Sequence, residues 1–240
     1  MNMLKTILGV LSICAAATVL TATAARVAPI VLPSSLNDGD QYHLDFVTTA
    51  KRDAIFSSDI EDYNSFVDAI GETVLASDWK AIASTEDVNA WENTETGDVS
   101  RGDVVDGVPI YLLESTRFAD DYYNLSFGLN ILAPPNITQL GTRTADTFAW
   151  TGTDLFGDRT FNALGIFGGF VSSGDPNATS SGWISSVGSF GILPHSVYAM
   201  SSVLTAQTST IPVSAPGPVT LFGMGVAGLA LLRRRRTATR

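Results

Sequence analysis

Cysteine is almost absent from this sequence of 240 residues, which contains Cys14 and no other. Cys14 lies in an N-terminal apolar stretch of the kind that is cleaved from exported proteins. The remaining chain then has no disulfide, no thiolate metal site and no cysteine nucleophile. Its stability must come from a hydrophobic core, which a chain of roughly 150 residues or more is long enough to build.

Histidine and basic side chains are also scarce. The two histidines, His43 and His195, leave little room for histidine catalysis. Residues 25–212 carry eight Lys and Arg against 24 Asp and Glu, a formal charge of −16. Such an acidic surface repels nucleic acid, other polyanions and anionic membranes, so we expect no nucleic-acid partner. A soluble secreted domain fits this composition.

No apolar run reaches the roughly 20 residues of an ordinary membrane-spanning helix. The first run, residues 6–20, follows Lys5 and precedes the small residues Ala22 and Ala24 in an A-x-A pattern. This order predicts a secretory signal peptide that signal peptidase cleaves after Ala24. The alternative interpretation of this run is a buried helix of the folded domain.

The second apolar run, residues 219–232, is short for a membrane span. It is followed by four consecutive arginines, Arg233, Arg234, Arg235 and Arg236. Arginines beside an apolar segment stay on the cytoplasmic side and reach into the lipid interface. We therefore expect a C-terminal anchor in the inner membrane, with the arginines in the cytoplasm and the domain outside.

Pro216, Gly217 and Pro218 precede this second run. Together with the glycine-containing apolar segment and the arginine cluster, they resemble the PEP-CTERM sorting signal of Gram-negative bacteria. The resemblance implies recognition by exosortase, a membrane transpeptidase that cuts near the motif and releases the protein to the cell surface or extracellular matrix. Contact with the membrane would then last only until processing. Gly217 departs from the family, which usually has glutamate at this position.

The two ends predict one globular domain between processed segments. The expected parts are a signal peptide at 1–24, a linker at 25–40, an extracytoplasmic domain at 41–204, a Ser/Thr/Pro spacer with the sorting motif at 205–218, a hydrophobic anchor at 219–232 and a basic cytoplasmic tail at 233–240. Such a protein is exported, anchored transiently in the inner membrane, and then located at the cell surface or outside the cell.

Helical patterns come early in the domain. Ser58 and Glu61 have the spacing of a capping box. They open a stripe of apolar residues at helical period, namely Ile60, Tyr63, Phe66, Val67, Ile70 and Val74. A second short helix is expected within 84–93, and a helical turn or short helix within 117–125.

Strand patterns dominate the second half. Residues 41–48 already alternate Tyr42, Leu44 and Phe46 with His43, Asp45 and Val47, which predicts a first strand. Further short strands are expected at 78–84, 108–115, 146–154, 162–171, 181–188 and 195–204. Two helices early and strands late predict an α+β fold with a mixed sheet, and an all-β sandwich is the alternative.

The order of these pieces resembles the endostatin domain of certain collagens, a variant of the C-type-lectin-like fold. Residues 108–110, 150–154, 181–183 and 195–200 carry the likeness. The resemblance implies that the first and last strands pair, which would bring the neighbourhoods of His43 and His195 together. The disulfides, histidine zinc cluster and arginine-rich surface of that family are missing here, so its known ligand chemistry does not carry over.

Two groups of residues have metal-ligating chemistry. Glu95, Asp98, Asp103 and Asp106 lie in one polar loop and offer several hard oxygen ligands, so calcium is the one cofactor the sequence suggests. A solvated acidic loop is the alternative. His43 and His195 would form a metal pair with Asp45 as third ligand, although strand histidines are more often ordinary hydrogen-bonded residues.

No residue pattern dictates an enzymatic activity. The chain has no Gly-x-Ser-x-Gly elbow and no phosphate-binding glycine loop. We therefore expect a non-enzymatic surface or matrix protein that binds exopolysaccharide or other matrix material. The alternatives are a secreted hydrolase that attacks extracellular polymer through paired carboxylates, and a single-pass membrane protein whose tail is never cut.

Overall fold

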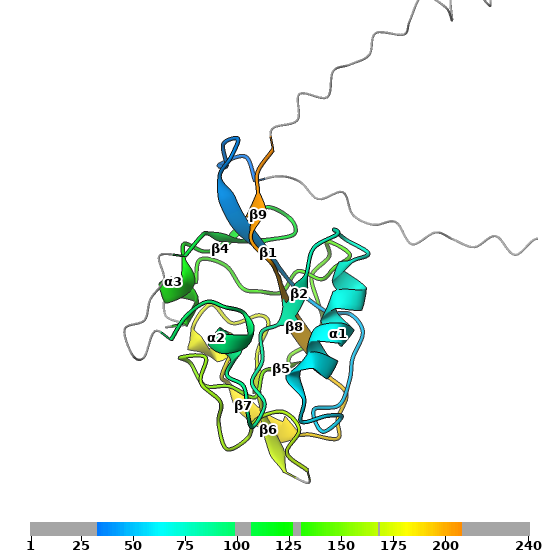
Figure 1. Cartoon of the computed structure of the whole chain (residues 1–240). Coiled ribbons are helices and arrows are strands. Elements are labelled where there is room, and N and C mark those ends of the chain that lie inside the picture. Colours follow the sequence, from blue (N-terminus) through cyan, green and yellow to red (C-terminus); the bar gives the residue numbers. More distant parts are fainter. Residues whose placement is uncertain (1–32, 99–106, 127–130, 168, 208–240) are drawn as a thin grey trace, which may run out of the picture.

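The computed structural model describes residues 33–98, 107–126, 131–167 and 169–207 (Figure 1). Their elements are β1 (Gln41–Val47), α1 (Ile60–Gly71), β2 (Trp79–Ala81), α2 (Ala90–Asn93), β3 (Ile110–Leu112), β4 (Arg117–Ala119), α3 (Tyr122–Ser126), β5 (Ala149–Trp150), β6 (Phe170–Gly174), the 3-10 helix η2 (Ser181–Trp183), β7 (Val187–Phe190), β8 (Ser196–Ser201) and β9 (Leu204–Thr205). No helix formed by these residues is long and apolar enough to cross a membrane.

The strands join one mixed sheet in the order β4-β3-β1-β8-β5-β6-β7, with β2 beside β8 and β9 beside β1. β1 runs parallel to β3 and antiparallel to β8, where Asp45 lies opposite Met200 and Val47 opposite Tyr198. The predicted pairing of the first strand with the last strands is therefore confirmed. A mixed sheet with few helices agrees with the predicted α+β class, and a mostly β class describes it equally well.

β1 confirms the strand predicted at 41–48, but both of its faces are buried. Every residue from Tyr42 to Val47 is at most 6% exposed. On one face Phe46 packs against Trp79 of β2, with ring centroids 4.9 Å apart. His43 and Asp45 point to the other face, because side chains alternate along a strand. The alternation in the sequence therefore places polar side chains in the core instead of in solvent.

Helix α1 lies against β2 and β8 (Figure 1). Its N-cap is Asp59, whose side chain accepts a hydrogen bond from the N–H of Glu61 at 3.0 Å. The capping box predicted at Ser58 is therefore wrong by one residue. At the other end of the helix, a Cβ on Gly71 would lie 2.3 Å from the ring of Trp79. The glycine thus allows the helix backbone to contact this tryptophan directly.

A pair of buried asparagines fixes α2 against α1 and β2. Asn64 of α1 and Asn93 of α2 exchange two side-chain hydrogen bonds, at 2.8 and 2.9 Å. The same amides bond both backbone groups of Ala81 in β2, at 3.0 and 2.7 Å. Because buried amides are stable only when their donors and acceptors are paired, this network sets the position of α2.

Two segments have a different secondary structure from the one predicted. The helical turn expected within 117–125 is confirmed by α3. Residues 117–119, at the start of that segment, instead form β4, because a tight turn with Ser115 at φ +74° folds them back onto β3. Residues 181–183, expected to be a strand, form η2, which places the indole of Trp183 in the core. In both cases a contact outside the local pattern decides the structure.

Gly174, at the end of β6, lets the end of η2 pack directly against the sheet. A Cβ on Gly174 would lie 1.7 Å from the carbonyl oxygen of Trp183. Trp183 itself is fully buried and lies edge-on to Phe118 and Tyr198, at centroid distances of 5.1 and 5.5 Å. Trp183 can thus occupy this position only because residue 174 has no side chain.

We expect Gly174→Ala to destabilise the domain by about 1–3 kcal/mol, because the new methyl group forces the Trp183 backbone away from the sheet. Urea unfolding followed by tryptophan fluorescence measures the change. Gly169→Ala is the matched control, because no described atom lies within 4 Å of a Cβ at Gly169. Equal losses of stability in the two variants would contradict this role of Gly174.

Candidate functional site

The chain between β5 and β6 forms an irregular loop, which the structure describes at residues 151–167 and 169. The sequence predicts a strand at 162–171, but β6 begins only at Phe170. Gly165, at φ +84°, turns the chain before it. Leu164 makes a single bridge to Thr85, which attaches the loop to the segment that precedes α2.

Asp154 organises the first half of this loop. Its side chain accepts hydrogen bonds from the N–H groups of Phe156 and Asp158, at 2.9 and 3.0 Å. Asp158 accepts a further hydrogen bond from the indole N–H of Trp91 at 2.9 Å, which ties the loop to α2. Partial burial raises the pKa of Asp154 above its ordinary value, although the two N–H groups act in the opposite direction.

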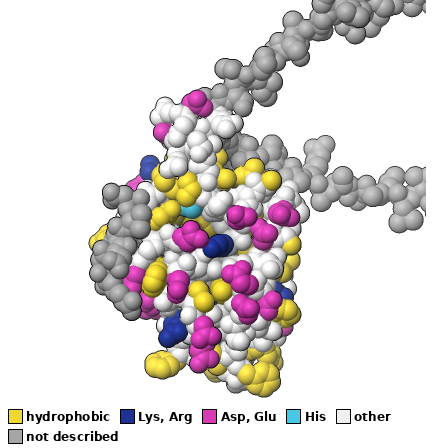
Figure 2. All heavy atoms as spheres, in the orientation of Figure 1, with side chains coloured by type: hydrophobic (Ala, Val, Ile, Leu, Met, Phe, Trp, Pro, Cys, Tyr) yellow, Lys and Arg dark blue, Asp and Glu magenta, His cyan; other side chains and the backbone are white. Residues whose placement is uncertain are grey.

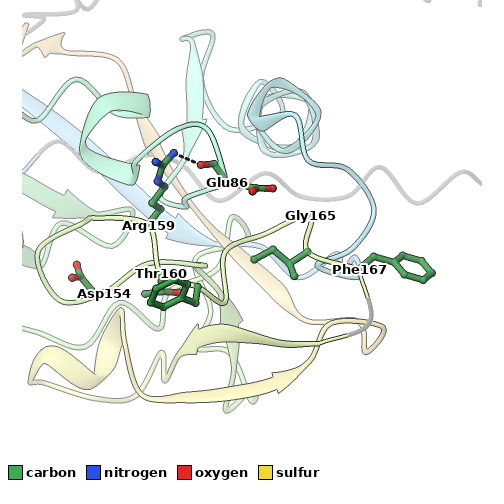
Figure 3. Close-up of a pocket in the computed structure, with 8 residues that line it drawn as sticks. Glu86, Asp154, Arg159, Thr160, Gly165 and Phe167 are labelled. Carbon is green, nitrogen blue, oxygen red and sulfur yellow. Dashed lines mark hydrogen bonds between the residues drawn. The ribbon is translucent and has the colours of Figure 1, made fainter.

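An open hollow of about 810 Å³ lies between this loop and the segment before α2 (Figure 3). Such a volume is within the range of ligand-binding clefts, about 300–1,000 Å³. Glu86 comes from the segment before α2, and the other lining residues come from the loop. The lining residues are Glu86, Asp154, Arg159, Thr160, Phe161, Gly165, Ile166 and Phe167.

Two phenylalanines of the hollow are exposed to an unusual degree. Phe161 is 100% exposed and Phe167 is 88% exposed. Figure 3 shows the ring of Phe167 extending away from Glu86 and Arg159. Leaving two aromatic rings in water costs the folded protein hydrophobic free energy, which a ligand that covers them would recover. These rings are therefore candidates for contact with a flat apolar ligand face.

Arg159 supplies the positive charge of the hollow. Its main-chain N–H donates to the side chain of Asn89 at 2.9 Å, and its guanidinium donates to the carbonyl oxygen of Glu86. Figure 3 shows Asp154 and Glu86 on opposite sides of Arg159. A guanidinium has five donors and each carboxylate has two acceptor oxygens. The hollow thus combines aromatic rings with donors and acceptors, the set that a ligand rich in hydroxyl groups requires.

Sequence reasoning did not single out Glu86, Arg159, Phe161 or Phe167. The available signal was the presence of two phenylalanines in a segment rich in Gly, Asn and Thr. Phe161 lies outside every predicted element, and Phe167 was assigned to the strand predicted at 162–171. The contact between Arg159 and Glu86 joins residues 73 positions apart, and no local pattern predicts it.

His43 is buried and hydrogen-bonded at both ring nitrogens. Its Nδ1 lies 2.7 Å from the carbonyl oxygen of Ser201, and its Nε2 lies 2.6 Å from the hydroxyl of Tyr122. The carbonyl requires a proton on Nδ1, so Nε2 accepts the hydroxyl proton of Tyr122. Burial lowers the pKa of His43 although nearby backbone groups raise it, so the ring is neutral. This arrangement is the ordinary structural role of a strand histidine.

His195 lies at the other end of the β1–β8 pair, opposite Arg52. The expected meeting of His43 and His195 is therefore wrong, because the antiparallel register separates them along the strands. The ring of His195 packs on Trp150, with centroids 4.6 Å apart, and its Nε2 lies 3.1 Å from Oγ of Ser189. Among the described residues, no three metal-ligating side chains come together.

Asp45 is fully buried in β1 between Leu112 of β3 and Met200 of β8. Neither carboxyl oxygen has a hydrogen-bond partner of normal geometry among the described residues. Burial raises the pKa of Asp45 well above its ordinary value of 3.8, and the neighbouring N–H of Phe46 lowers it by less. Because an uncompensated buried charge is costly, this group is a buried carboxylic acid.

Of the expected calcium ligands, Asp103 and Asp106 lie outside the described residues. Glu95 is exposed and pairs with Lys80, with Oε1 and Nζ 3.1 Å apart, whereas Asp98 is buried. The calcium site stays a prediction. The residues of the expected cleavage and sorting signals, Ala22, Ala24, Pro216, Gly217, Pro218 and Arg233 to Arg236, also lie outside the described part.

Comparison with known proteins gives no family for this chain. No family model matches it. No curated protein matches it either. Function must therefore be inferred from the sequence and the geometry of the chain itself.

We expect Asp45 to make the stability of the domain fall as the pH rises. Because its pKa is higher in the folded than in the unfolded chain, its contribution is complete below the ordinary pKa of 3.8. Above that pH, stability is lost by ~1.4 kcal/mol per pH unit until the folded-state pKa is reached. Asp45→Asn removes this titration and keeps the shape of the side chain.

Urea unfolding of the natural chain and of Asp45→Asn, repeated across a series of pH values from acid to neutral, measures the effect. We expect the stability advantage of the variant to grow with pH. A difference between the two proteins that stays constant over the series would contradict a protonated Asp45.

Proposed function

We propose that this chain is a secreted surface or matrix protein whose domain binds polysaccharide without cleaving it. The hollow between Glu86 and the β5–β6 loop is the proposed binding site. The exposed rings of Phe161 and Phe167 beside Arg159 carry the proposal. A sugar ring has an apolar face and many hydroxyl groups, so it requires both an aromatic surface and hydrogen-bonding side chains.

The charge of the chain narrows the class of polysaccharide. Residues 25–212 have a formal charge of −16, so a polymer rich in carboxylate, sulfate or phosphate groups is repelled. A neutral polysaccharide meets no such barrier. The proposed partner is therefore a neutral exopolysaccharide in the matrix of the producing cell.

The finer fold assignment is part of the same proposal. The pairing of β1 with β8 and β9, the long helix that follows β1, and the irregular loop before β6 support an endostatin-like or C-type-lectin-like fold. None of these features requires the disulfides or metal ligands of that family.

Export and sorting rest on the two ends of the sequence. The proposed signal peptide ends at Ala24, and the proposed exosortase signal combines Pro216, Gly217 and Pro218 with the apolar run and the arginine cluster. Signal peptidase and exosortase are then the processing partners of the chain. Calcium binding at the 95–106 loop remains part of the proposal, since calcium would neutralise some of its acidic charge.

A hydrolase is the second candidate function, and one observation favours it. Two carboxylates, Glu86 and Asp154, line the same hollow. The pKa of Asp154 is raised by burial, as that of a general acid must be. Its side chain, however, already accepts two main-chain hydrogen bonds, which suits the structure of the loop better than proton transfer.

We expect the double variant Phe161→Ala, Phe167→Ala to bind the exopolysaccharide of the producing cell at least about fivefold more weakly. Each ring contributes roughly 0.5–1.5 kcal/mol of stacking. Affinity electrophoresis in gels that contain the polymer measures the change. Tyr123→Ala is the control, because Tyr123 is a half-exposed aromatic residue on α3, outside the hollow.

Unchanged migration of the double variant would contradict the proposed binding site. Release of reducing ends from the polymer by the natural chain would favour the hydrolase instead. Loss of that activity in the variant Glu86→Gln would assign the hydrolysis to the hollow.

The sorting proposal predicts the mass of the protein recovered from its native host. We expect a chain that lacks residues 1–24 and the segment beyond about Pro218, located outside the inner membrane. Intact mass spectrometry after cell fractionation measures both properties. A mass that retains 219–240 in the inner membrane fraction would contradict sorting and establish a permanent single-pass membrane protein.

A further inference from the structure

β7 is the last strand of the sheet, and no other described strand pairs with its outer edge. Gly188 of β7 lies opposite Ser172 of β6. The backbone of Ser172 bonds away from β7, since its N–H donates to Asn162 at 2.8 Å and its carbonyl accepts from Gly152 at 3.0 Å. Ser172 and Gly188 are therefore a non-hydrogen-bonded pair. The N–H and carbonyl of Gly188 point away from β6, toward the free edge of the sheet.

Apolar side chains surround this free backbone. Phe170 and Phe190 are cross-strand partners with ring centroids 4.4 Å apart, yet they are 51% and 56% exposed. Val187, Ile192 and Leu193 are exposed as well. In Figure 2, hydrophobic side chains gather at the end of the molecule where Figure 1 places β6 and β7. We call these five residues the apolar edge.

The apolar edge belongs to the uncharged part of an acidic protein. Residues 176–207 contain no Asp, Glu, Lys or Arg, and neither does β6. Edge strands are usually protected against pairing by a charged residue, a proline or a bulge, and β7 has none of these. Two copies of this chain repel each other over most of their surface, and that repulsion is weakest here.

We propose that β7 pairs antiparallel with β7 of a second copy of this chain, joining the two sheets across a two-fold axis at Gly188. Such a pair is self-complementary, because each Gly188 N–H donates to the carbonyl of the other. The Phe170 and Phe190 rings of both copies then lie on one face of the joined sheet. The carbonyl of Phe190 already accepts the N–H of Leu193 in the same chain, at 2.9 Å. It is therefore not available to the second copy, and the ladder between the two β7 strands is short.

A short ladder makes the apolar edge essential to the dimer, because few backbone hydrogen bonds are available to hold it. The β5–β6 hollow uses other residues, so loss of the dimer and loss of polysaccharide binding are separable. Phe190→Lys is expected to weaken dimerisation, since it removes one ring of the apolar edge and places a charged side chain on the edge strand. Phe161→Ala is expected to leave the dimer intact.

Cysteine cross-linking of the full chain tests the geometry. In a Cys14→Ser background, Gly188→Cys places two thiols across the two-fold axis. The Cα atoms of a hydrogen-bonded antiparallel pair are about 5.5 Å apart, within disulfide range. We expect oxidation to give a species of twice the 25.4 kDa chain mass on non-reducing gels. Ser202→Cys, an exposed position beyond β8, is the matched control.

We expect Phe190→Lys to reduce the cross-linked fraction of Gly188→Cys roughly tenfold. A Cβ at position 188 would lie 3.2 Å from the Cβ of Phe170, so the cysteine variant itself disturbs the packing at the apolar edge. Sedimentation velocity of the natural chain and of Phe190→Lys, neither of which carries Gly188→Cys, is therefore the second measurement. Equal cross-linking at Ser202→Cys and Gly188→Cys would overturn the proposal. A natural chain that sediments as a monomer would also overturn it, and would leave the apolar edge to a different partner.

Discussion

The antiparallel pairing of β1 with β8 is the contact on which the rest of the described structure depends. It brings together segments from opposite ends of the domain, as the bond between His43 and Ser201, 158 residues apart, illustrates. β3 and β9 attach to β1, and β2 and β5 attach to β8. Because the two strands lie inside the sheet with both faces covered, every side chain on them must be accommodated in the core.

The core accommodates its polar side chains in two different ways. His43 and Ser201 are paired completely, since the imidazole bonds Tyr122 and a carbonyl, and the Ser201 hydroxyl accepts the N–H of Leu44 at 3.0 Å. Asp45, two residues after His43 in β1, has no comparable partner among the described residues. The first arrangement adds hydrogen bonds to the strand pair. The second keeps a carboxylic acid neutral by burial alone.

The sequence predicted the elements whose buried side chains recur at the period of a strand or a helix. The strand at β1 and the apolar stripe of α1 both follow from the spacing of their apolar residues, and the mixed sheet follows from the order of the elements. It failed where a turn or a packing contact outside the apolar period decides the local structure. β4 is a strand because its turn returns it to β3, and η2 is a helix because Trp183 enters the core below Gly174.

The candidate site was hidden for the same reason. Glu86 belongs to the segment before α2, and its place beside Arg159 depends on the buried Asn64–Asn93 pair and on the hydrogen bond between Trp91 and Asp158. Neither contact has a signature in sequence spacing. The exposed rings of Phe161 and Phe167 are visible as residue types, but only the structure shows that they share one hollow.

β9 has a mechanical consequence. It returns the chain beside the start of β1, where Gln41 lies opposite Thr205 and the N–H of Ala206 donates to the carbonyl of Asp40 at 2.7 Å. Both ends of the described domain therefore leave it at one end of the molecule, opposite β6 and β7 (Figure 1). A force that pulls these two ends apart loads the β1–β9 hydrogen bonds one pair at a time, so the strands separate by peeling and resist little. A force applied through only one of the two ends leaves the β1–β9 pair unloaded. The fold therefore withstands tension far better when the domain is attached by one end than when both ends are attached and pulled apart.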